Sequence, residues 1–473
     1  MTRKTLSDLI AARFHLTITQ AEAGHLNYSF ERNREFSTDL YGDAAMPKLI
    51  QQIGYGVLTT GLAIVTTKAY AVPDPCTIVF SELVQSELSL TPAQEDLVST
   101  CSQYANASDQ LTPYQALAQT TLAISIANQQ FRNVKNRLML LRRGLGSGID
   151  VSGLNQQPTD AFLPSSLSGF SRQSNGGGAS GDKDSPFDRL GIFVNGNFGV
   201  GDKDGTDREL GFEYDSQGVT AGVDYRFTDN FVLGGTFGYN AIKSDFDASR
   251  GNLNLDGYSF SLYSTYYNDD FYLDTIFSGG WNEYDTRRNI QLPGFNQTTL
   301  GNTRGNDYSF NVTGGYDFHQ QGLTYGPYGR VSYQNVQIDG YQENSSNSSA
   351  LGFGGLTTID KQNAVSLQTA LGGQLSYAFS TSFGVLMPIA RAEWVHEFHN
   401  GSRPLNWSFS SIPNQQTSFV NLSDGSSRNF ANLSAGLSAT FTHGTSAFLS
   451  YEAMVGRENI SEHSINAGVR TEF

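Results

Sequence analysis

Long apolar runs are missing from most of this sequence. Beyond residue 71, no stretch approaches the roughly 20 consecutive apolar residues that a membrane-spanning helix needs. Only 16% of the residues are charged, and yet the mean hydropathy is below zero. A helical membrane protein is therefore excluded, and any membrane crossing has to use strands.

Positive charge and cysteine are also scarce. Lys and Arg number 30 against 45 Asp and Glu, which gives a net charge of −15 and argues against a nucleic-acid partner. Cys76 and Cys101 are the two cysteines. They predict either one disulfide, in an oxidising compartment such as the periplasm, or two free thiols.

Motifs for chemistry are lacking as well. The sequence has no Walker loop, no CxxC pair and no GDSL-type block. His396 and His399 are three residues apart, and on a strand this spacing sends the two side chains to opposite faces. We therefore expect no catalytic residues, no cofactor and no metal site.

Glycine and aromatic residues are abundant instead, with 50 Gly, 23 Tyr and 31 Phe. In a membrane-spanning β-barrel, each strand presents one residue to lipid and the next to a polar lumen. A composition that is rich in aromatics and glycine but only weakly hydrophobic is what such a barrel produces.

A secretory signal peptide is predicted in residues 46–71. Lys48 precedes an apolar run over 53–65, and Ala69-Tyr70-Ala71 forms an A-x-A cleavage site. Since this signal begins 45 residues inside the chain, it is either an extended signal peptide or the start of a chain whose first residue is Met46. In both cases residues 1–71 are set aside from the fold.

From Phe187 onward, the chain alternates between aromatic or β-branched residues and polar ones in segments of about ten residues. About twelve such strands are predicted. They cover 190–199, 218–227, 231–241, 257–267, 271–283, 308–318, 323–336, 364–379, 384–395, 429–441, 445–455 and 460–473.

The connections between these strands alternate in length. Short links such as 228–230 and 319–322 follow the even-numbered strands, whereas most odd-numbered strands are followed by long polar links such as 287–304, 339–363 and 397–428. This alternation is typical of an outer-membrane barrel with its short turns in the periplasm, and it is not required of a soluble β-sandwich.

The two faces of the strands differ in chemistry. In the last strand, Ile465 and Val469 share one face while Asn466 and Arg470 share the other. The same parity predicts lumen-facing arginines at 226, 330 and 391. It also predicts six lumen-facing carboxylates: Asp224, Asp274, Asp317, Glu393, Glu452 and Glu472.

Two helix starts precede the strands. Thr91-Pro92 and Thr112-Pro113 each combine a threonine N-cap with proline at the first turn and glutamine three residues after the cap. The second helix meets no breaker before Gly144, so 113–143 would extend about 46 Å. The Gly/Ser-rich residues 144–186 then form a linker to the first strand.

The second helix ends in a cluster of cations: Arg132, Lys135, Arg137, Arg142 and Arg143. These side chains suit a lumen with inward carboxylates, so we predict that the helix runs through the pore and is held by charge pairs. The alternative is an exposed periplasmic helix with a solvated basic end.

The chain resembles the autotransporter β-domain, the translocator of type V secretion. The resemblance covers about residues 120–473 and rests on four short stretches and their order. They are FRNVKNRL at 131–138, GPYGR at 326–330 followed by Asp339-Gly340-Tyr341, WVHEF at 394–398, and AGVRTEF at 467–473.

This resemblance implies a twelve-stranded antiparallel barrel with a helix in its pore. It also implies that the barrel-assembly machinery recognises the last strand, with Phe473 as the main determinant and Gly468 beside it. Thr471 departs from the large apolar residue usual at its position. Family members that cut themselves use two adjacent asparagines, where this chain has Arg132 and Asn133, so we expect no self-cleavage.

The function expected from this resemblance is a translocator barrel, 187–473, that exports or displays a short helical segment, 72–111, ahead of a pore helix, 112–143. A porin-like barrel and an outer-membrane hydrolase are the alternatives. We expect a monomer in the outer membrane of a Gram-negative bacterium, with lipid, lipopolysaccharide, periplasmic chaperones and the assembly machinery as partners.

Overall fold

The computed structural model describes most of the chain beyond the predicted signal peptide. All described residues belong to one compact unit, Ala71–Phe473. They are 74–84, 89–142, 189–268, 270–293, 295–346, 353–412, 418–441 and 445–472. The predicted signal peptide, the whole predicted linker 144–186, Arg143 and Phe473 lie outside these ranges.

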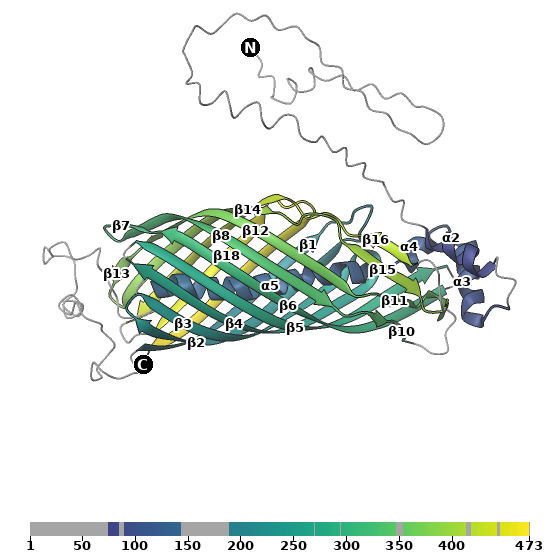
Figure 1. The fold of residues 1–473 in the computed structure, drawn as a ribbon, viewed down its shortest axis with the longest axis horizontal. Helices are drawn as coiled ribbons and strands as arrows, with labels where there is room; N and C mark the ends of the chain where they lie inside the picture. Colours follow the sequence, from purple (N-terminus) through teal and green to yellow (C-terminus); the bar gives the residue numbers. More distant parts are fainter. Residues whose placement is uncertain are drawn as a thin grey trace, which may run out of the picture. The chain divides into compact units, whose positions relative to one another are not determined.

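Twelve long antiparallel strands close into a barrel (Figure 1). The first strand pairs with the last, from Gly191 opposite Glu472 to Lys203 opposite Ile460. Because every barrel strand has a partner on each side, the barrel has no open edge. The strands are β1 (Leu190–Lys203), β2 (Phe212–Thr228), β3 (Phe231–Phe246), β4 (Gly251–Asn268), β5 (Phe271–Leu292), β6 (Phe295–Tyr316), β8 (Leu323–Ile338), β12 (Gln362–Tyr377), β14 (Gly384–Glu397), β17 (Asn429–Phe441), β18 (Ser446–Val455) and β19 (Ile460–Glu472).

The two ends of the barrel differ, and we call them the turn end and the loop end. At the turn end, short links such as Asp229-Asn230 join β2 to β3. Two three-residue strands, β7 (Phe318–Gln320) and β13 (Phe379–Thr381), extend the neighbouring strands there. At the loop end, residues 339–361 join β8 to β12, and residues 398–428 join β14 to β17.

All twelve predicted strands are present, but several extend further toward the loop end than expected. The stretch 287–304 was predicted to be a loop, whereas β5 and β6 continue as a hairpin to Leu292 and Phe295. This prediction was wrong because the polar residues of this stretch remove the apolar alternation but do not prevent backbone pairing. A strand that projects beyond the lipid needs no apolar face.

The predicted faces of the strands are correct. Ile465 and Val469 are 47% and 59% exposed on the outer surface, whereas Asn466 is 2% exposed and faces the lumen. In β6, Phe310 is likewise exposed and Asn311 is buried. The outer wall is therefore apolar and the lumen polar, as a lipid-embedded barrel requires.

Among the described residues, five helical segments precede the barrel: α2 (Pro75–Val79), η1 (Phe80–Val84), α3 (Pro92–Gln103), α4 (Ala107–Leu111) and α5 (Tyr114–Arg142). Helix α3 begins with the expected capping box, in which Thr91 and Gln94 each bond to the other's backbone. The five-residue helices α2 and α4 were not predicted, since one turn carries no periodicity. None of the described helices is both long and apolar enough to cross a membrane.

A small four-stranded sheet lies at the loop end, in regions predicted only as loops. It consists of β9 (Tyr341–Gln342), β11 (Thr357–Ile359), β15 (Pro404–Phe409) and β16 (Phe419–Leu422), in the order β16-β15-β11-β9. Further short elements in this region are β10 (Asn344–Ser345), η4 (Phe353–Gly355) and, between β3 and β4, η3 (Asp247–Ser249).

Candidate functional site in the barrel lumen

Helix α5 runs through the barrel from the loop end to the turn end (Figure 1). Its 29 residues extend about 44 Å, longer than the roughly 30 Å hydrocarbon core of a bilayer. Most of its residues are buried, including glutamines and asparagines. A helix with so many buried polar groups is stable only where its surroundings supply hydrogen-bond partners.

The lumen wall supplies these partners. The Gln130 side-chain amide donates to the hydroxyls of Thr236 and Ser261, each at 3.0 Å. The Asn133 amide donates to Asn197 Oδ1 at 3.1 Å and Thr220 Oγ1 at 2.9 Å. Small hydroxyl and amide side chains on β1 to β4 therefore form a polar surface that matches this helix.

Glycines bring the helix close to that wall. Gly238 and Gly257 lie on the lumen faces of β3 and β4. A Cβ atom at Gly257 would lie 3.1 Å from Ile126 Cγ2 of the helix, and one at Gly238 would collide with Gln130 Oε1. Side chains at these two positions would push α5 away from the wall.

Arg137 makes the best-ordered charge pair between helix and barrel. Its Nε and one terminal nitrogen each donate to a separate carboxylate oxygen of Asp224 at 2.7 Å. The Tyr263 hydroxyl also donates to Asp224, at 2.9 Å, and the guanidinium stacks on the Phe193 ring at 5.0 Å. A bidentate pair with further donors and a ring face satisfies both buried charges.

A second cluster of charges lies in the second half of the helix, around Arg132 and Lys135. Lys135 is 3.1 Å from Glu393 and 3.6 Å from Glu452. Glu393 also accepts hydrogen bonds from the Tyr328 hydroxyl at 2.8 Å and from Arg330 at 2.9 Å. The structure thus brings together one predicted pore-helix cation, two predicted lumen carboxylates and one predicted lumen arginine.

The remaining predicted residues have different partners or lie outside the described part. Arg142 pairs with Asp274 near the turn end. Asp317 accepts a hydrogen bond from Gln374 at 2.6 Å rather than from a helix cation. Arg226 donates to the Tyr267 hydroxyl. Arg143 is outside the described residues, and so is the side chain of Glu472.

Glu462 is a lumen carboxylate of the candidate site that the sequence analysis did not identify. It accepts a hydrogen bond from Arg132 at 2.5 Å and another from the Tyr214 hydroxyl at 3.2 Å. Glu462 has the same strand parity as the lumen-facing Asn466 in β19. Extending the parity to the start of that strand would have identified it, but we applied it only from residue 465.

Helices α2 to α4 form a cap at the loop end, defined here as residues 74–112. Apolar residues of the cap, among them Val79, Leu97 and Leu111, share one hydrophobic core with Trp407 and Phe409 of β15. Gln94 of the cap also donates to the backbone oxygen of Ser411 at 2.9 Å. The cap is therefore packed onto the barrel's own loops.

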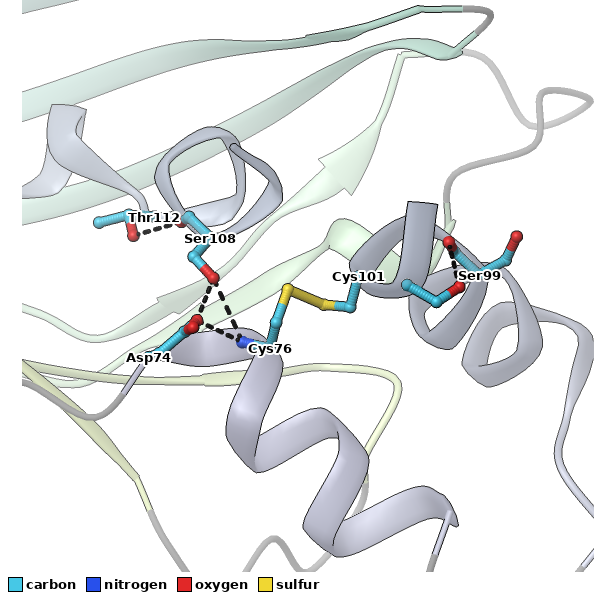
Figure 2. The surroundings of a disulfide bond; sticks show 7 residues. Asp74, Cys76, Ser99, Cys101, Ser108 and Thr112 are labelled. Atoms are coloured by element: carbon cyan, nitrogen blue, oxygen red, sulfur yellow. Dashed lines mark hydrogen bonds between the residues drawn. A yellow bond between two sulfur atoms is a disulfide. The ribbon is translucent and has the colours of Figure 1, made fainter. Parts of the chain in front are cut away.

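A disulfide joins Cys76 of α2 to Cys101 of α3 (Figure 2). Figure 2 also shows Asp74 at the start of α2, where its carboxylate accepts from the Cys76 backbone N–H at 2.9 Å and from the Ser108 hydroxyl of α4. The disulfide and these hydrogen bonds connect three short helices that are too short to be stable alone.

Two buried arginines of the barrel rim bind the junction between α4 and α5. Arg288 of β5 donates to Glu343 at 3.0 and 2.5 Å and to the Leu111 backbone oxygen at 3.0 Å. Arg250, just before β4, donates to the Asp109 carboxylate and backbone oxygen, each at 2.7 Å. Both arginines thus contact the C-terminal end of α4, where the helix dipole stabilises a nearby positive charge.

Glu343 lies between β9 and β10 and also accepts hydrogen bonds from Thr299 and Thr357. Burial by itself would raise the pKa of Glu343, but the Arg288 guanidinium and the hydroxyl donors together hold that pKa below its ordinary value. The carboxyl group is therefore charged at neutral pH and is linked, through Arg288, to the end of α4.

His396 and His399, the pair with three-residue spacing, lie at the loop end of β14. His396 Nδ1 is 2.9 Å from Asn429 Oδ1, and the His399 backbone N–H donates to Glu397 at 2.9 Å. Within the described ranges, no group of three or more His, Cys, Asp or Glu side chains is arranged to hold a metal ion.

A family model described as "Autotransporter beta-domain" matches residues 192–452, more than half of the chain. The barrel that the structure describes covers this range.

Curated relatives include two enzymes. Esterase EstA of Pseudomonas aeruginosa is 26% identical over 227 residues, which are 47% of this chain and 33% of the relative. Lipase 1 of Photorhabdus luminescens is 27% identical over 269 residues, 54% of this chain and 38% of the relative. The chain thus matches only about a third of the length of these relatives.

Solved structures of similar fold include two translocator domains. That of the autotransporter NalP from Neisseria meningitidis has a TM-score of 0.47 and 17% identity, and covers 60% of this chain and 88% of the domain. The β domain of the Bordetella autotransporter BrkA has a TM-score of 0.44 and 18% identity, and covers 60% of this chain and all of the domain (100%).

Proposed function

The chain belongs to the autotransporter β-domain family, and from this premise we propose that its cap is a short passenger-like segment that remains at the cell surface. The barrel is an autotransporter translocator in the outer membrane of a Gram-negative bacterium. The observation that carries the proposal is the course of α5, which passes through the lumen and links the cap at one end to the turn end at the other.

Orientation follows from the two barrel ends. We assign the turn end to the periplasm and the loop end to the outside, because outer-membrane barrels have short periplasmic turns and long outer loops. The apolar outer wall contacts lipid, and the strands that extend beyond it at the loop end lie in the zone of lipopolysaccharide. The cap, at the loop end, then faces the medium.

The segment stays attached to its barrel. Self-cleavage at an asparagine requires the side-chain nitrogen to attack the residue's own carbonyl carbon. In this chain the Asn133 amide nitrogen donates to Asn197 and Thr220, and Asn133 itself is fully buried. Its neighbour Arg132 is engaged with Glu462 and supplies no second amide. The expected product is therefore one continuous mature chain.

Assembly depends on the last strand. We propose that Phe473 and Gly468 are read by the barrel-assembly machinery after periplasmic chaperones deliver the chain, and that the folded protein is a monomer. Glycine is also required at position 468 for a structural reason, because a Cβ there would collide with the Asn195 side chain and the Phe448 ring. Deletion of Phe473 should abolish the heat-modifiable folded band on gels.

No enzymatic activity is proposed for the cap. The names esterase and lipase describe relatives of which this chain matches about a third. The barrel domain is not itself catalytic. The cap's apolar residues are used in packing against β15 and its neighbours, and the proposal assigns the cap a role in closing and displaying rather than in hydrolysis.

Epitope accessibility tests the display. A tag inserted between residues 86 and 87 should bind antibody on intact cells, whereas a tag between Asp229 and Asn230, at the turn end, should bind only after the outer membrane is permeabilised. Both insertion variants should show the heat-modifiable band of the folded barrel. A cap tag that is reached only after permeabilisation would place residues 74–112 in the periplasm and refute the proposal.

A separate experiment tests whether the disulfide holds the displayed cap together. Replacing both cysteines, C76S/C101S, should leave the barrel folded but make the cap more sensitive to proteinase K added outside the cells. The chain-entropy model assigns such a cross-link about 3 kcal/mol. Equal digestion of the variant and the parent chain would show that the disulfide does not hold the cap together.

A further inference from the structure

Arg391 lies beside the charge cluster around Lys135 and Glu393 but makes no direct ion pair with a carboxylate of the described residues. It lies on the lumen face of β14 and is 9% exposed. One terminal nitrogen donates to Asn136 Oδ1 of α5 at 2.5 Å. Among the described residues, no carboxylate oxygen lies within 4.0 Å of its guanidinium, and its Nε–H has no hydrogen-bond acceptor.

The charges joined by contacts in this cluster do not balance. Arg132, Lys135, Arg330 and Arg391 bring four positive charges, and three carboxylates face them: Glu393, Glu452 and Glu462. Glu393 already accepts from Lys135 and Arg330. Glu393, on the same face of β14, is thus shared among several cations. Because a buried surplus of one positive charge is unfavourable in a low-dielectric interior, the cluster favours a negatively charged ligand beside Arg391.

A cavity opens beside Arg391, between α5 and the wall formed by β14, β17 and β18. The enclosed space is small, with room for about one particle of the size of a water molecule. Its polar lining residues are Arg391, Asn136, Ser434 and Ser450, with Met139 and Phe448 among its apolar ones. Arg391 and Ser434 are direct cross-strand neighbours, so a cationic group and a hydroxyl face the same space.

The residues that line the cavity determine which kind of ligand it can bind. One guanidinium with hydroxyl and amide groups nearby provides hydrogen-bond donors for an anion, but the apolar residues offer nothing to a strongly hydrated, multiply charged ion such as phosphate. We propose that this cavity is a binding site for a small monovalent anion of the halide class, held by Arg391. The anion would supply the missing negative charge and tie α5, through Asn136 and Arg391, to the β14 wall.

Bromide provides a direct test. Crystals of the full chain grown in sodium bromide should show an anomalous peak next to the Arg391 guanidinium, and the same experiment on R391Q should show none there. A wild-type map without this peak, or an R391Q map that keeps it, overturns the site.

Thermal unfolding in detergent, followed by the heat-modifiable band, tests the site in solution. At equal ionic strength, wild type should melt on the order of a few degrees higher in sodium chloride than in sodium gluconate, because a ligand bound only to the folded state raises the midpoint. R391Q should melt at the same temperature in both salts. The matched control is R137Q, which lies in another charge pair and should keep the chloride effect at a lower midpoint.

The measurement in sodium gluconate also distinguishes an anion site from an ordinary structural role of Arg391. Because R391Q breaks no direct ion pair and removes the surplus positive charge, R391Q in gluconate should be at least as stable as wild type in gluconate. A marked loss of stability there, or an equal chloride effect in both proteins, would mean that Arg391 is neutralised within the chain and would refute the anion site.

Discussion

Arg137 and Asp224 show how a charged side chain is accommodated in this lumen. Both are almost fully buried, at 2% and 4% exposure, and the pair is completed by the Tyr263 hydroxyl and the Phe193 ring. Removing one member of such a pair costs more than the intact pair contributes, because the other charge is left in a low-dielectric site. The lumen pairs therefore specify where α5 lies rather than simply adding stability.

We predict that R137Q lowers the free energy of unfolding by about 3 kcal/mol or more, through the unpaired Asp224. Urea titration of the refolded barrel in detergent would measure it. D224N should cost a similar amount, and the double variant R137Q/D224N should cost clearly less than the two single changes combined. Additive losses would show that the two side chains do not act as a pair. R137K keeps the charge but loses the bidentate geometry, so its loss should be intermediate.

Glu343 gives the loop end a defined response to pH. It lies at the loop end, outside the membrane-spanning part, and its pKa in the folded protein is held below the ordinary value, mainly by the neighbouring Arg288, against the effect of burial. A carboxylate of this kind stabilises the folded state above its unfolded pKa of about 4.3, and this contribution is lost as the pH falls further through the folded pKa.

We therefore predict that the cap is protected from added protease between neutral pH and about pH 5 and becomes sensitive below about pH 4. E343Q should be more sensitive at neutral pH and should show a flatter pH dependence. Pepsin and proteinase K cover the two pH ranges. The control is E283Q, since Glu283 is 53% exposed in its pair with Arg304 and should change neither property. An unchanged acid response in E343Q would assign that response to other groups.

At the scale of elements, the position of α5 depends on glycines of the facing strands, which have no side chains. Gly238 and Gly257 leave room for Gln130 and Ile126, so the helix lies against β3 and β4. The amides of Gln130 and Asn133 can then reach the hydroxyls of the wall directly. Helix and strands are thus matched by small residues on one side and polar side chains on the other.

We predict that G257V loosens α5, because a side chain there would meet Asn282 Oδ1 at 2.6 Å and Ile126 of the helix at 3.1 Å. The measured effect should be faster hydrogen exchange along α5 and an increase in single-channel conductance. G279V is the matched control, since a Cβ at Gly279 has its nearest neighbour at 3.9 Å, within ordinary contact distance. Equal exchange rates in the two variants would contradict close packing at Gly257.

Strand alternation was readable from the sequence because the barrel has two chemically different faces. Parity placed Asp224, Asp274, Glu393 and Glu452 in the lumen, and the Thr-Pro signals placed the starts of α3 and α5. The loop-end hairpin of β5 and β6 was missed, since both of its faces are largely polar there and alternation disappears. The capping box at Thr91 needed only local contacts, and local contacts are what sequence patterns report.

The sequence did not reveal which helix cation pairs with which lumen carboxylate. Arg132 lies 330 positions before Glu462, and their contact depends on the rotation and height of α5 in a closed barrel. The same holds for the cap, whose core joins residues such as Leu97 and Trp407 that no short-range pattern connects. Arg391 was placed in the lumen by parity, but its lack of a carboxylate partner emerged only from the three-dimensional arrangement.

At the scale of the whole molecule, we propose that two successive structures close the pore. The cap covers the loop end through its shared core with β15 and through Arg288 and Arg250, and α5 occupies the lumen below it. The two closures are joined at the α4–α5 junction, where residues 112 and 113 separate the helices. Their contributions can therefore be separated by deletion.

We predict low single-channel conductance in planar bilayers for the full chain, a small rise when residues 74–111 are deleted, and a large rise when residues 74–143 are deleted. The reason is that α5 keeps its lumen pairs, such as Arg137 with Asp224, when only the cap is lost. Without the helix, polar strand faces remain around an open, water-filled lumen. Each variant should first show the heat-modifiable band of a folded barrel. If removing the cap alone opens the pore as widely as removing both parts, the cap is the main barrier and the helix leaves a path beside it. The cavities lined by Asn128 and by Asn136 along one side of α5 would be the first place to look for that path.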